Sequence, residues 1–529
     1  WGVEIYLLLT KWNPLNIDDP LPKNNTGHSV LIAGLGPAGF ALSHYMLNAG
    51  HEVVAIDGLK ISPLHFDSSK LVKNWSDIKI DLSKRQPQGF GGVAEYGITN
   101  RWDKNNLTLI RLMLERRAAF NIIGGVRLGS NITTKQAFDA GFAHIALCVG
   151  AGKPRFMKEN DYFAKGVRSA ADFLMNLQQG GAYLKNSNSN LLLRMPAIVI
   201  GCGLTAIDSA VELLHYYPAQ VEKFLTDWES KEHPEQGLNE EELEVAHELI
   251  EHALMFRGVN SHEQKLEILQ NIGGVSICYR KELKQSPAYR LNHEEIEHAL
   301  AIGIKFEEQI VPAKINTDQY NHVCSVDFTN NKNIKAKSVL VAIGTETNEF
   351  QDIDLSNKIS YFGDCNQKYA GSVVKALASA KNGYKQISKS LNIQPKRKLN
   401  INFKEQFISR IKQVNMLSDN IVELIIHSPL AAQNFKPGQF FRLQNHSGDL
   451  SKIMEPLALT GFYADKEQGV VSLIVLVMGN SSKLCLGLKP GEIVTLMGPS
   501  GEPTKIAKNK KMLLIGGGLG NAVLAPIGQ

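Results

Sequence analysis

Short runs of consecutive apolar residues recur along the chain, each followed by a glycine-rich turn and then by apolar residues at helical spacing. Residues 30–33 precede such a turn at 34–39, and residues 197–200 precede another at 201–206. A continuous apolar run is typical of a parallel strand that is buried on both faces. The pattern therefore predicts an α/β fold with two strand–turn–helix openings of the kind that bind dinucleotides.

The glycines of the first opening are spaced as a pyrophosphate-binding turn requires. Gly34 permits a tight turn, Gly36 leaves room for the phosphates, and Gly39 lets the helix pack closely on the strand. A second apolar run ends at Asp57, about twenty residues later, where a carboxylate can bind ribose hydroxyls. The candidate residues of this site are Gly34, Gly36, Pro37, Ala38, Gly39 and Asp57.

The second opening differs at its third position, where Ala206 replaces glycine, a pattern commoner where NADP(H) binds. Beyond the next strand-like run, at 275–278, Arg280 and Lys281 offer positive charge to a 2′-phosphate. The alternative is a single cofactor with a vestigial repeat of the fold. The candidate residues here are Gly201, Gly203, Thr205, Ala206, Arg280 and Lys281.

Further glycine-containing segments accompany these openings. The loop at 89–97 is either a surface loop or a backbone face for a flat ligand, and the apolar runs at 145–148 and 338–342 end in small residues. A Gly-Asp pair at 363–364, followed by a helix start at 372, suits ribityl and phosphate groups. The candidate residues are Gly92, Gly97, Gly150, Gly152, Gly344, Gly363, Asp364, Ser372 and Val373.

The apolar pattern changes after a polar, proline-bearing stretch at 392–399. Alternating and β-branched runs then dominate, with turn signals at 437–438 and 490–491, which predicts an all-β module, a small barrel. A third apolar run at 511–515 leads into Gly516, Gly518 and Gly520. A sheet that begins in this way needs roughly 100 further residues, so we expect the chain to be part of a longer one.

Composition and charge narrow the classes of function. The 529 residues are 43% apolar and 21% charged, and the formal net charge of +5 is too small to indicate nucleic acid or an acidic membrane as partner. No apolar run approaches the ~18 residues of a membrane-spanning helix. We therefore expect a cytoplasmic protein with no membrane span.

The nucleophilic and metal-ligating residues show no recognisable site pattern. None of the six cysteines forms a C-x-x-C pair, which argues against a zinc ribbon, a local iron–sulfur motif and a redox dithiol. The histidines lack metal-ligand spacing, and there is no G-x-S-x-G nucleophile elbow. We expect structural cysteines, no metal and no catalytic acid, base or nucleophile. Arg111, Arg116 and Arg117 are expected on a solvated helix face rather than at a phosphate site.

Residues 29–390 resemble the small subunit of glutamate synthase and its relatives, which include the large subunit of NADH-dependent ferredoxin–NADP oxidoreductase. The matching motifs lie in family order at 34–39, 91–98, 149–155, 171–174, 201–208 and 363–364. The resemblance implies FAD on the first opening and at Gly363-Asp364, and NADP(H) on an inserted domain. It also implies that Arg280 and Lys281 lie near the 2′-phosphate.

Residues 399–529 resemble the ferredoxin-reductase superfamily, in particular the electron-transfer subunit of dihydroorotate dehydrogenase. The motifs at 437–441, 455–460, 498–501 and 516–520 carry this resemblance. It implies a second flavin held by Pro456, Leu457, Leu459, Thr460 and Ser482, and iron–sulfur clusters only outside this chain.

Pattern and resemblance together predict two interleaved Rossmann-like domains followed by a barrel. The segments are an N-terminal extension at 1–28, an FAD-binding domain at 29–195 and 338–391, an inserted NAD(P)-binding domain at 196–337, a ferredoxin-reductase-like β-barrel at 399–507, and the truncated start of an NAD-binding domain at 510–529.

The activity implied by the resemblance is FAD-dependent oxidation of NAD(P)H, with electrons passing through flavin to an iron–sulfur protein or a second nicotinamide. In this family the nicotinamide transfers a hydride directly to the flavin, so the protein supplies orientation and electrostatics. Two alternatives stay open: a non-catalytic dinucleotide-binding or scaffold subunit of a larger redox complex, and a disulfide reductase. Oligomeric assembly stays open as well.

Overall fold

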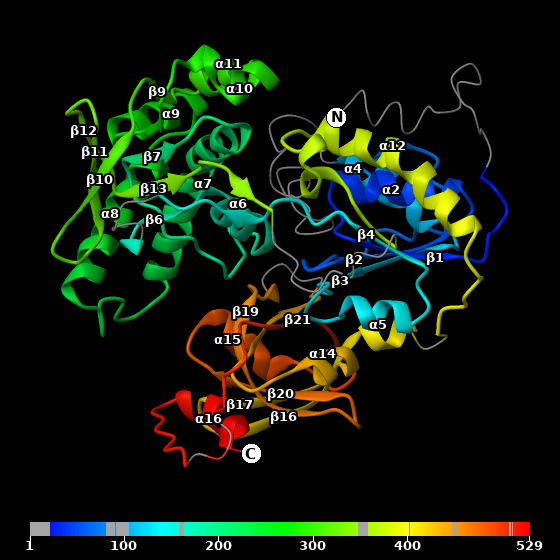
Figure 1. The fold of residues 1–529 in the computed structure, drawn as a ribbon. Helices are drawn as coiled ribbons and strands as arrows, with labels where there is room; N and C mark the ends of the chain where they lie inside the picture. The colour runs from blue at the N-terminus through cyan, green and yellow to red at the C-terminus, as the bar shows by residue number, and fades with distance from the viewer. Residues whose placement is uncertain are drawn as a thin grey trace. The chain divides into compact units, whose positions relative to one another are not determined.

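The computed structural model describes residues 22–80, 90, 105–157, 163–347, 358–400, 403–447, 452–506, 509 and 511–528. The chain forms two compact units (Figure 1). Unit 1 comprises residues 1–95, 102–152 and 347–529, and unit 2 comprises residues 96–101 and 153–346. Each unit contains one parallel sheet, and unit 1 also contains a barrel.

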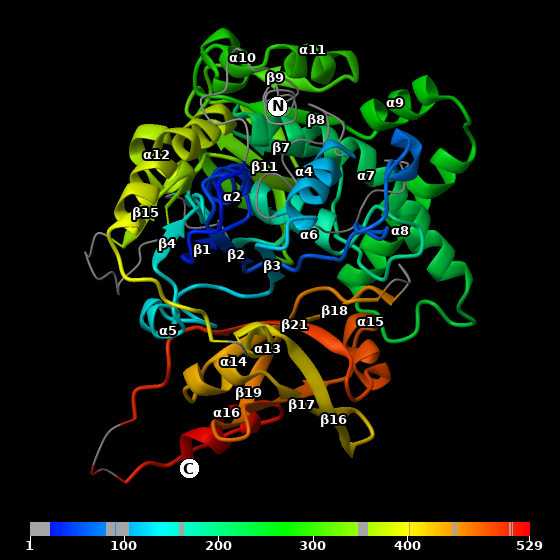
Figure 2. The same cartoon turned by 90° about the vertical axis from the view of Figure 1, so that its right-hand side faces the viewer.

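The sheet of unit 1 has the strand order β15-β4-β1-β2-β3, and every neighbouring pair is parallel. Its strands are β1 (Ser29–Ala33), β2 (Glu52–Asp57), β3 (Phe120–Gly124), β4 (His144–Leu147) and β15 (Ile359–Tyr361). Helices α2 (Pro37–Asn48), α4 (Asn105–Glu115) and α12 (Val373–Asn392) cover one face, and α5 (Thr134–Asp139) lies on the other (Figures 1 and 2). The rings of Tyr45 and Tyr384 stack 4.9 Å apart where α2 meets α12.

The second part of unit 1 is a closed barrel in the order β16-β17-β20-β19-β18-β21, which confirms the predicted small barrel. Its strands are β16 (Ser409–Ser418), β17 (Ile421–His427), β18 (Phe440–Asn445), β19 (Leu457–Asp465), β20 (Val470–Leu476) and β21 (Ile493–Ser500), with α13 (Phe403–Phe407), α14 (Pro429–Asn434) and α15 (Asn480–Lys483). The barrel strands enclose an apolar core of their own. Phe407 of α13 and Leu430 of α14 instead join the apolar core of the parallel sheet, so these two helices connect barrel and sheet.

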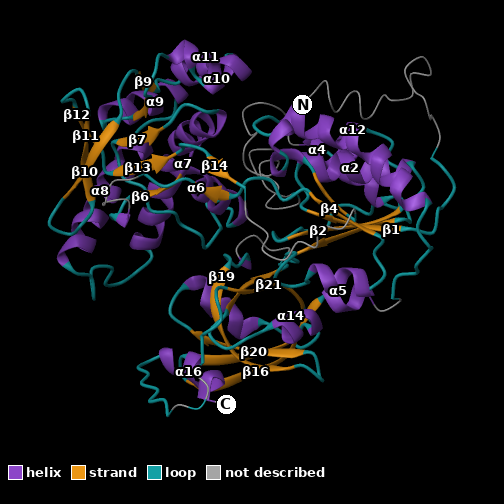
Figure 3. Cartoon of the chain, in the orientation of Figure 1, coloured by secondary structure: helices purple, strands orange, loops and turns teal. Residues whose placement is uncertain are grey.

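Unit 2 has a parallel sheet in the order β6-β13-β7-β8-β9. Its strands are β6 (Val167–Ser169), β7 (Ala197–Ile200), β8 (Val275–Cys278), β9 (Lys305–Glu307) and β13 (Ser338–Val341). An antiparallel sheet of β10 (Pro312–Thr317), β11 (Val323–Phe328) and β12 (Asn333–Lys335) belongs to the same unit (Figure 3). The chain enters the main segment of unit 2 at β5 (Lys153–Pro154) and leaves it at β14 (Thr345–Glu346), and these two short strands pair with each other.

The inserted unit is longer than the expected range of 196–337. Strand β6 precedes that range and β13 follows it, yet the two strands pair with each other in the second sheet. A short apolar strand such as 338–341 fits the interior of either parallel sheet equally well, so its pattern does not decide between them. The structure therefore moves residues 153–195 and 338–346 from the first domain to the inserted one.

Unit 2 contains six α-helices among its described residues. They are α6 (Ala170–Gln179), α7 (Leu204–Glu229), α8 (Glu240–Arg257), α9 (His262–Asn271), α10 (Pro287–Leu291) and α11 (Glu294–Ala301). Three of them, α7 to α9, fill the sequence between the second glycine turn and β8. Asn239 caps α8, since its side chain accepts the N–H of Glu242, as the acidic start of that helix suggests. Short 3-10 helices lie at Trp75–Asp77, Leu283–Gln285, Gly363–Cys365, Gln367–Tyr369 and Leu484–Gly487.

The strand predicted at 511–515 does not form. These residues have no regular structure, Leu513 is 84% exposed, and the chain becomes helical only at α16 (Gly520–Gly528). A parallel strand is stable only between partner strands, and no described strand pairs with this segment. Gly516, Gly518 and Gly520 therefore lie in exposed backbone at the start of a helix, without the strand that a nucleotide-binding turn follows.

Two features are absent from the part of the chain that the structure describes. No helix in this part combines the length and the apolar character that crossing a bilayer requires. No group of three or more His, Cys, Asp and Glu side chains is arranged to hold a metal ion within the described residues.

Candidate functional site

The carboxyl edge of the unit 1 sheet gathers segments that lie far apart in the sequence. Strands β1, β2, β4 and β15 are parallel, so their carboxyl ends lie at one edge. Asp57 ends β2 there, and Gly34, Gly150 and Gly363 come shortly after β1, β4 and β15. A Cβ built on Gly363 would lie 3.1 Å from the Cβ of Ala38, in the first turn of α2. The structure thus brings most of the predicted first-site residues together at the place where open α/β sheets bind ligands.

Two glycines of the first turn are required by the fold itself. Gly34 has φ +101°, and a Cβ there would lie 2.4 Å from the carbonyl oxygen of Cys148. A Cβ on Gly39 would lie 1.9 Å from the carbonyl oxygen of Gly34. The predicted roles of these residues, a tight turn and a close helix–strand approach, are confirmed.

The start of α2 is suited to a phosphate group. Its N-cap residue, Gly36, has extended backbone angles and contributes no side-chain acceptor, and Pro37 follows at the first helical position. By contrast, Thr133, Asn239 and Ser261 cap their helices with a side-chain oxygen. Helix N–H groups without such an acceptor can bind an anion, so the residues present fit a dinucleotide pyrophosphate.

Asp57 ends β2 beside this turn. Its two carboxylate oxygens accept the N–H groups of Leu35, at 2.7 Å, and Leu59, at 2.8 Å. Burial raises the pKa of the carboxyl group, against the opposite effect of the two hydrogen bonds. Each oxygen keeps a second lone pair, so Asp57 can hold the turn and still accept a ribose hydroxyl.

Residues 363–375, which follow β15, lie at the same edge. Asp364 accepts the N–H of Gly371 at 2.9 Å. Ser372, the residue before Val373, caps α12 by accepting the N–H of Lys375 at 3.2 Å. The Cys365 thiol donates to the carbonyl of Gly150 at 3.4 Å. Gly152 leads out of this edge, and Gly92 and Gly97 lie outside the described residues.

The arginines of α4 and the turn after it depart in part from the expected solvated face, since Arg116 is exposed, Arg117 is half-buried and Arg111 is buried. Arg111 is buried, donates to Glu115 and to the carbonyl of Ser62, and lies over the ring of Phe90 at 5.7 Å. Arg116 and Arg117 donate to residues of neighbouring segments. A helical pattern reveals which residues face away from a core, but not which loops cross that face.

Unit 2 repeats the edge architecture with different residues. Gly201 has φ +119°, and a Cβ there would lie 2.2 Å from the carbonyl oxygen of Ala342. A Cβ on Gly203, the N-cap of α7, would meet nothing within 4 Å. Ala206 is fully buried, and Thr205 lies beside it in the first turn of α7.

The basic pair lies where Asp57 lies in unit 1. Arg280 and Lys281 follow β8, which is the parallel neighbour of β7, and both are exposed. Neither has an ion-pair partner among the residues that the structure describes. Gly344, with φ +97°, follows β13 at the same edge.

The predicted site residues of β19 lie on two different faces of the strand. Leu457 and Leu459 pack into the barrel core, so only their backbone can reach a ligand outside it. Thr460 lies on the alternate face of β19, opposite Phe440, and Ala458 lies opposite Arg442. Phe440 and Arg442 were missed from the sequence, although alternation along β18 places them on that outer face beside Thr460.

The loop beside this face uses its polar groups internally. Ser482 accepts the N–H groups of Met478 and Gly479, both at 3.0 Å, and donates to the carbonyl of Gly479. Pro456 stands immediately before β19. The hydroxyl predicted to bind a phosphate is therefore committed to the turn that precedes α15.

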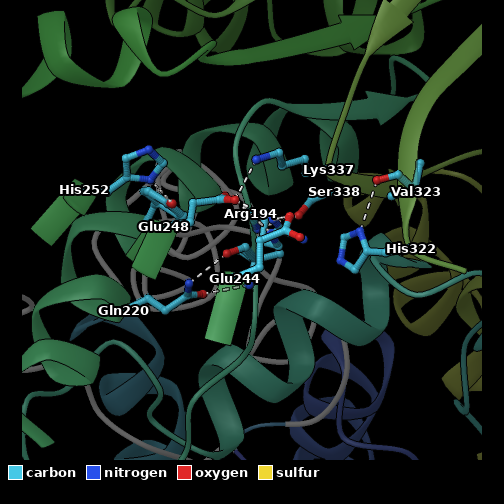
Figure 4. Close-up of polar contacts among 11 residues, drawn as sticks. Arg194, Gln220, Glu244, Glu248, His252, His322, Val323, Lys337 and Ser338 are labelled. Carbon is cyan, nitrogen blue, oxygen red and sulfur yellow. Dashed lines mark hydrogen bonds and ion pairs between the residues drawn. The ribbon is translucent and has the colours of Figure 1, made fainter. Parts of the chain in front are cut away.

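The opposite, amino edge of the unit 2 sheet carries a buried ionic network (Figure 4). Arg194, whose side chain is 4% exposed, donates twice to Glu248, and Lys337 donates to the same carboxylate at 2.6 Å. The Arg194 N–H also bonds the Ser338 hydroxyl at the start of β13. The network ties α8 to the strand starts, away from the carboxyl edge, and is structural.

The six cysteines are all free, and four of them are buried. Burial raises the pKa values of Cys148, Cys202, Cys278 and Cys485. Thiols of this kind are poor nucleophiles, which supports the expectation of structural cysteines.

No family model matches the sequence. A segment covering 22% of the chain is 32% identical to 40% of "Dihydroorotate dehydrogenase B (NAD(+)), electron transfer subunit homolog" of Thermotoga maritima. Another, covering 39% of the chain, is 26% identical to 37% of "Glutamate synthase [NADPH] small chain" of Bacillus subtilis. The chain thus spans less than half of the length of these two relatives.

Among solved structures, FprA of Mycobacterium tuberculosis in complex with NADPH aligns with a TM-score of 0.44 at 14% identity, over 69% of this chain and 84% of that one. The uncharacterized protein RP006 of Rickettsia prowazekii is 50% identical over an alignment of 546 residues, which covers 97% of this chain and 76% of the relative. The chain therefore belongs to the same family as RP006.

Proposed function

We propose that the chain is a flavin-dependent NAD(P)H oxidoreductase that passes electrons to an iron–sulfur protein or to a second nicotinamide. One observation carries the proposal: two parallel sheets each present a glycine turn and an N-cap glycine at their carboxyl edges, one beside an acidic residue and one beside a basic pair. Two dinucleotides with different ribose chemistry fit these edges. The names of the two partial relatives, which mention NADPH, NAD and electron transfer, support the same class.

In this proposal unit 1 holds FAD. The N–H groups at the start of α2 bind its pyrophosphate, Asp57 accepts a ribose hydroxyl, and Gly363, Asp364 and the start of α12 receive the ribityl side. When bound, FAD supplies a ring system that takes two electrons from a reduced nicotinamide and releases them one at a time. The chain's own groups bind and orient, and no protein acid or base is needed.

Unit 2 holds the nicotinamide nucleotide, with a preference for NADPH. Because Gly203 has no side chain, the space at the start of α7 stays open to a pyrophosphate. A Cβ at this position would project into that space. Arg280 and Lys281 balance the charge of a 2′-phosphate, which NADH lacks. We further propose that the outer face of β18 and β19, at Phe440, Arg442 and Thr460, holds a second flavin.

Paired glycine variants test the assignment of the two edges. Gly36 and Gly203 both have extended backbone angles, which valine also adopts. The fold should therefore tolerate Gly36→Val and Gly203→Val. We expect Gly36→Val to lose the yellow flavin of unit 1. Gly203→Val should keep it but resist bleaching by NADPH under anaerobic conditions. Full flavin content in Gly36→Val, or a colourless wild-type protein after reconstitution with FAD, would refute the proposal.

The number of flavins tests the barrel separately. Protein reconstituted with FAD or FMN and freed of unbound flavin should contain about two flavins per chain if both sites fill. A ratio near one, unchanged by Thr460→Val, would make the barrel a structural element.

A further inference from the structure

Strand β21 of the barrel packs against two loops that leave the carboxyl edge of the unit 1 sheet. A Cβ built on Gly58 would lie 3.4 Å from the sulfur of Met497, and one on Gly125 would lie 2.4 Å from Cγ2 of Thr495. Gly58 directly follows Asp57, and Gly125 directly follows β3. The barrel therefore reaches the residue next to the carboxylate that ends β2.

Asn131 fastens this contact with its side-chain amide. It is 5% exposed, donates to the carbonyl of Leu496 at 3.0 Å, and accepts the N–H of Gly498 at 3.2 Å. From the barrel side, Asn434 donates to the carbonyl of Asn131 at 2.9 Å and to Gln136 at 3.0 Å. A buried amide loses stability when its partners are removed, so these bonds oppose separation of barrel and sheet.

The two loops are also bonded to each other. The N–H of Gly125 donates to the carbonyl of Leu59 at 2.8 Å, and that of Val126 donates to the carbonyl of Asp57 at 2.9 Å. An unbroken series of contacts thus runs from β21 through residues 125–131 to residues 57–59. Asp57 and Leu59 are the residues that fix the carboxylate and the glycine turn through the bonds described above.

We propose that the barrel forms a wall of the unit 1 dinucleotide site, with Asn131, Asn434 and Met497 as positioning residues. β21 holds the loops at 57–60 and 125–131 in the conformation that binds the adenosine end of a dinucleotide. Barrel docking and dinucleotide binding then stabilise each other to the same extent, because coupling between two binding events is reciprocal. The proposal rests on the proposed FAD site for the identity of the ligand, but not for the wall itself.

The test uses the full chain with the double variant Asn434→Ala/Met497→Ala. The matched control is Asn420→Ala/Met416→Ala, because both of its residues are exposed at the far hairpin of the barrel. Amide hydrogen exchange is measured first, without added nucleotide, on peptides that cover 57–61 and 124–131. Dissociation constants for FAD are then measured by fluorescence titration. If the amides of β17 and β20 in each variant exchange at the same rates as in the wild type, the barrel of that variant is folded.

We expect the docking variant to exchange at least about tenfold faster in both loops and to bind FAD about tenfold more weakly, the effect of roughly one lost hydrogen bond. The control should match the wild type in both measurements. Unchanged exchange in the loops overturns the wall. Faster exchange with unchanged FAD affinity overturns the coupling. A wild-type chain that binds no FAD refutes the proposed function, while the exchange result still decides whether the wall exists.

Discussion

The two sheets present the same turn with different chemistry around it. In both units the first glycine has a positive φ, and a Cβ there would collide with a carbonyl of the adjacent strand. At the third position the units diverge, because Gly39 has no room for a Cβ while Ala206 carries one in the core. At the end of the next strand, unit 1 carries an acid, whereas unit 2 carries a basic pair at the corresponding position. The shared features are steric requirements of the fold, and the divergent ones distinguish ligands.

The amino edges of the same sheets differ as well. In unit 1, His28, His51 and His144 are buried at the starts of neighbouring strands. The ring of His51 bonds the hydroxyl groups of Thr26 and Ser388, and that of His144 bonds the hydroxyl group of Ser360. In unit 2 the corresponding edge holds the network of Arg194, Glu248 and Lys337. One edge is therefore closed by groups that must stay neutral, and the other by groups that must stay charged.

The largest difference is expected from exchanging the third residue of each turn. Gly39→Ala forces a Cβ to within 1.9 Å of a backbone oxygen that cannot move without opening the turn. We expect it to destabilise unit 1 by about 4 kcal/mol or more, while Ala206→Gly costs about 1 kcal/mol in unit 2. Urea unfolding of both variants measures this. Similar losses in the two units would show that the turns are sterically equivalent.

Breaking the ionic network should come next in size. Glu248→Ala leaves Arg194 buried without its main carboxylate partner, since Glu244 is exposed and 3.6 Å away. We expect a loss of about 3 kcal/mol in the unfolding free energy of unit 2. The matched control is Glu229→Ala, which removes an exposed partner of Arg257 and should change stability by less than about 1 kcal/mol. A small effect of Glu248→Ala would mean that Arg194 reaches solvent.

Acid should destabilise the histidine edge. Burial, with the charges of nearby groups, lowers the pKa values of His51 and His144 to about 4. Since the unfolded chain binds these protons near pH 6.5, each stabilising contribution is complete above that pH and is lost as pH falls toward 4. At pH 5 the loss is about 2 kcal/mol for each histidine.

Hydrogen exchange of unit 1 peptides between pH 7.5 and pH 5, corrected for intrinsic exchange rates, checks this expectation. His144→Gln keeps a group that can bond Ser360 but cannot be protonated, so it should reduce the pH dependence by one proton. In unit 2, burial also lowers the pKa of His252, and that of Glu248 is lowered by Arg194 and Lys337 against the effect of burial. Equal acid sensitivity in the two units would contradict the contrast between their edges.

The sequence predicted the parts of the fold that depend on local pattern. The buried strands before Gly34 and Gly201, the acid at Asp57 and the barrel are each encoded within a few residues, by apolar runs, glycines or alternation. The prediction was wrong where partners in space decide. Residues 338–341 could join either sheet, 511–515 lacks a partner strand, and Arg111 is covered by loops from elsewhere.

The candidate sites follow the same division. Glycine turns were placed correctly because backbone sterics set them. Leu457 and Leu459 were assigned to a ligand although alternation along β19 turns them inward, and Phe440 and Arg442 were missed because cross-strand pairing brings them to Thr460. The contact of β21 with Gly58 joins residues more than 400 positions apart, and no local pattern indicates it.

The smallest effect is expected at the basic pair of unit 2, and it sharpens the comparison with Asp57 most directly. Arg280→Ala removes a charge that only a 2′-phosphate uses, so affinity for NADPH should fall about tenfold while affinity for NADH stays unchanged. The matched control is Arg290→Ala, an exposed arginine on α10 that does not follow β8. Titration of each variant with both nucleotides, followed by flavin bleaching, gives the four affinities. An equal fall for NADPH and NADH would assign Arg280 to the pyrophosphate or to the fold, and the acid–base contrast between the two edges would then say nothing about which nucleotide unit 2 prefers.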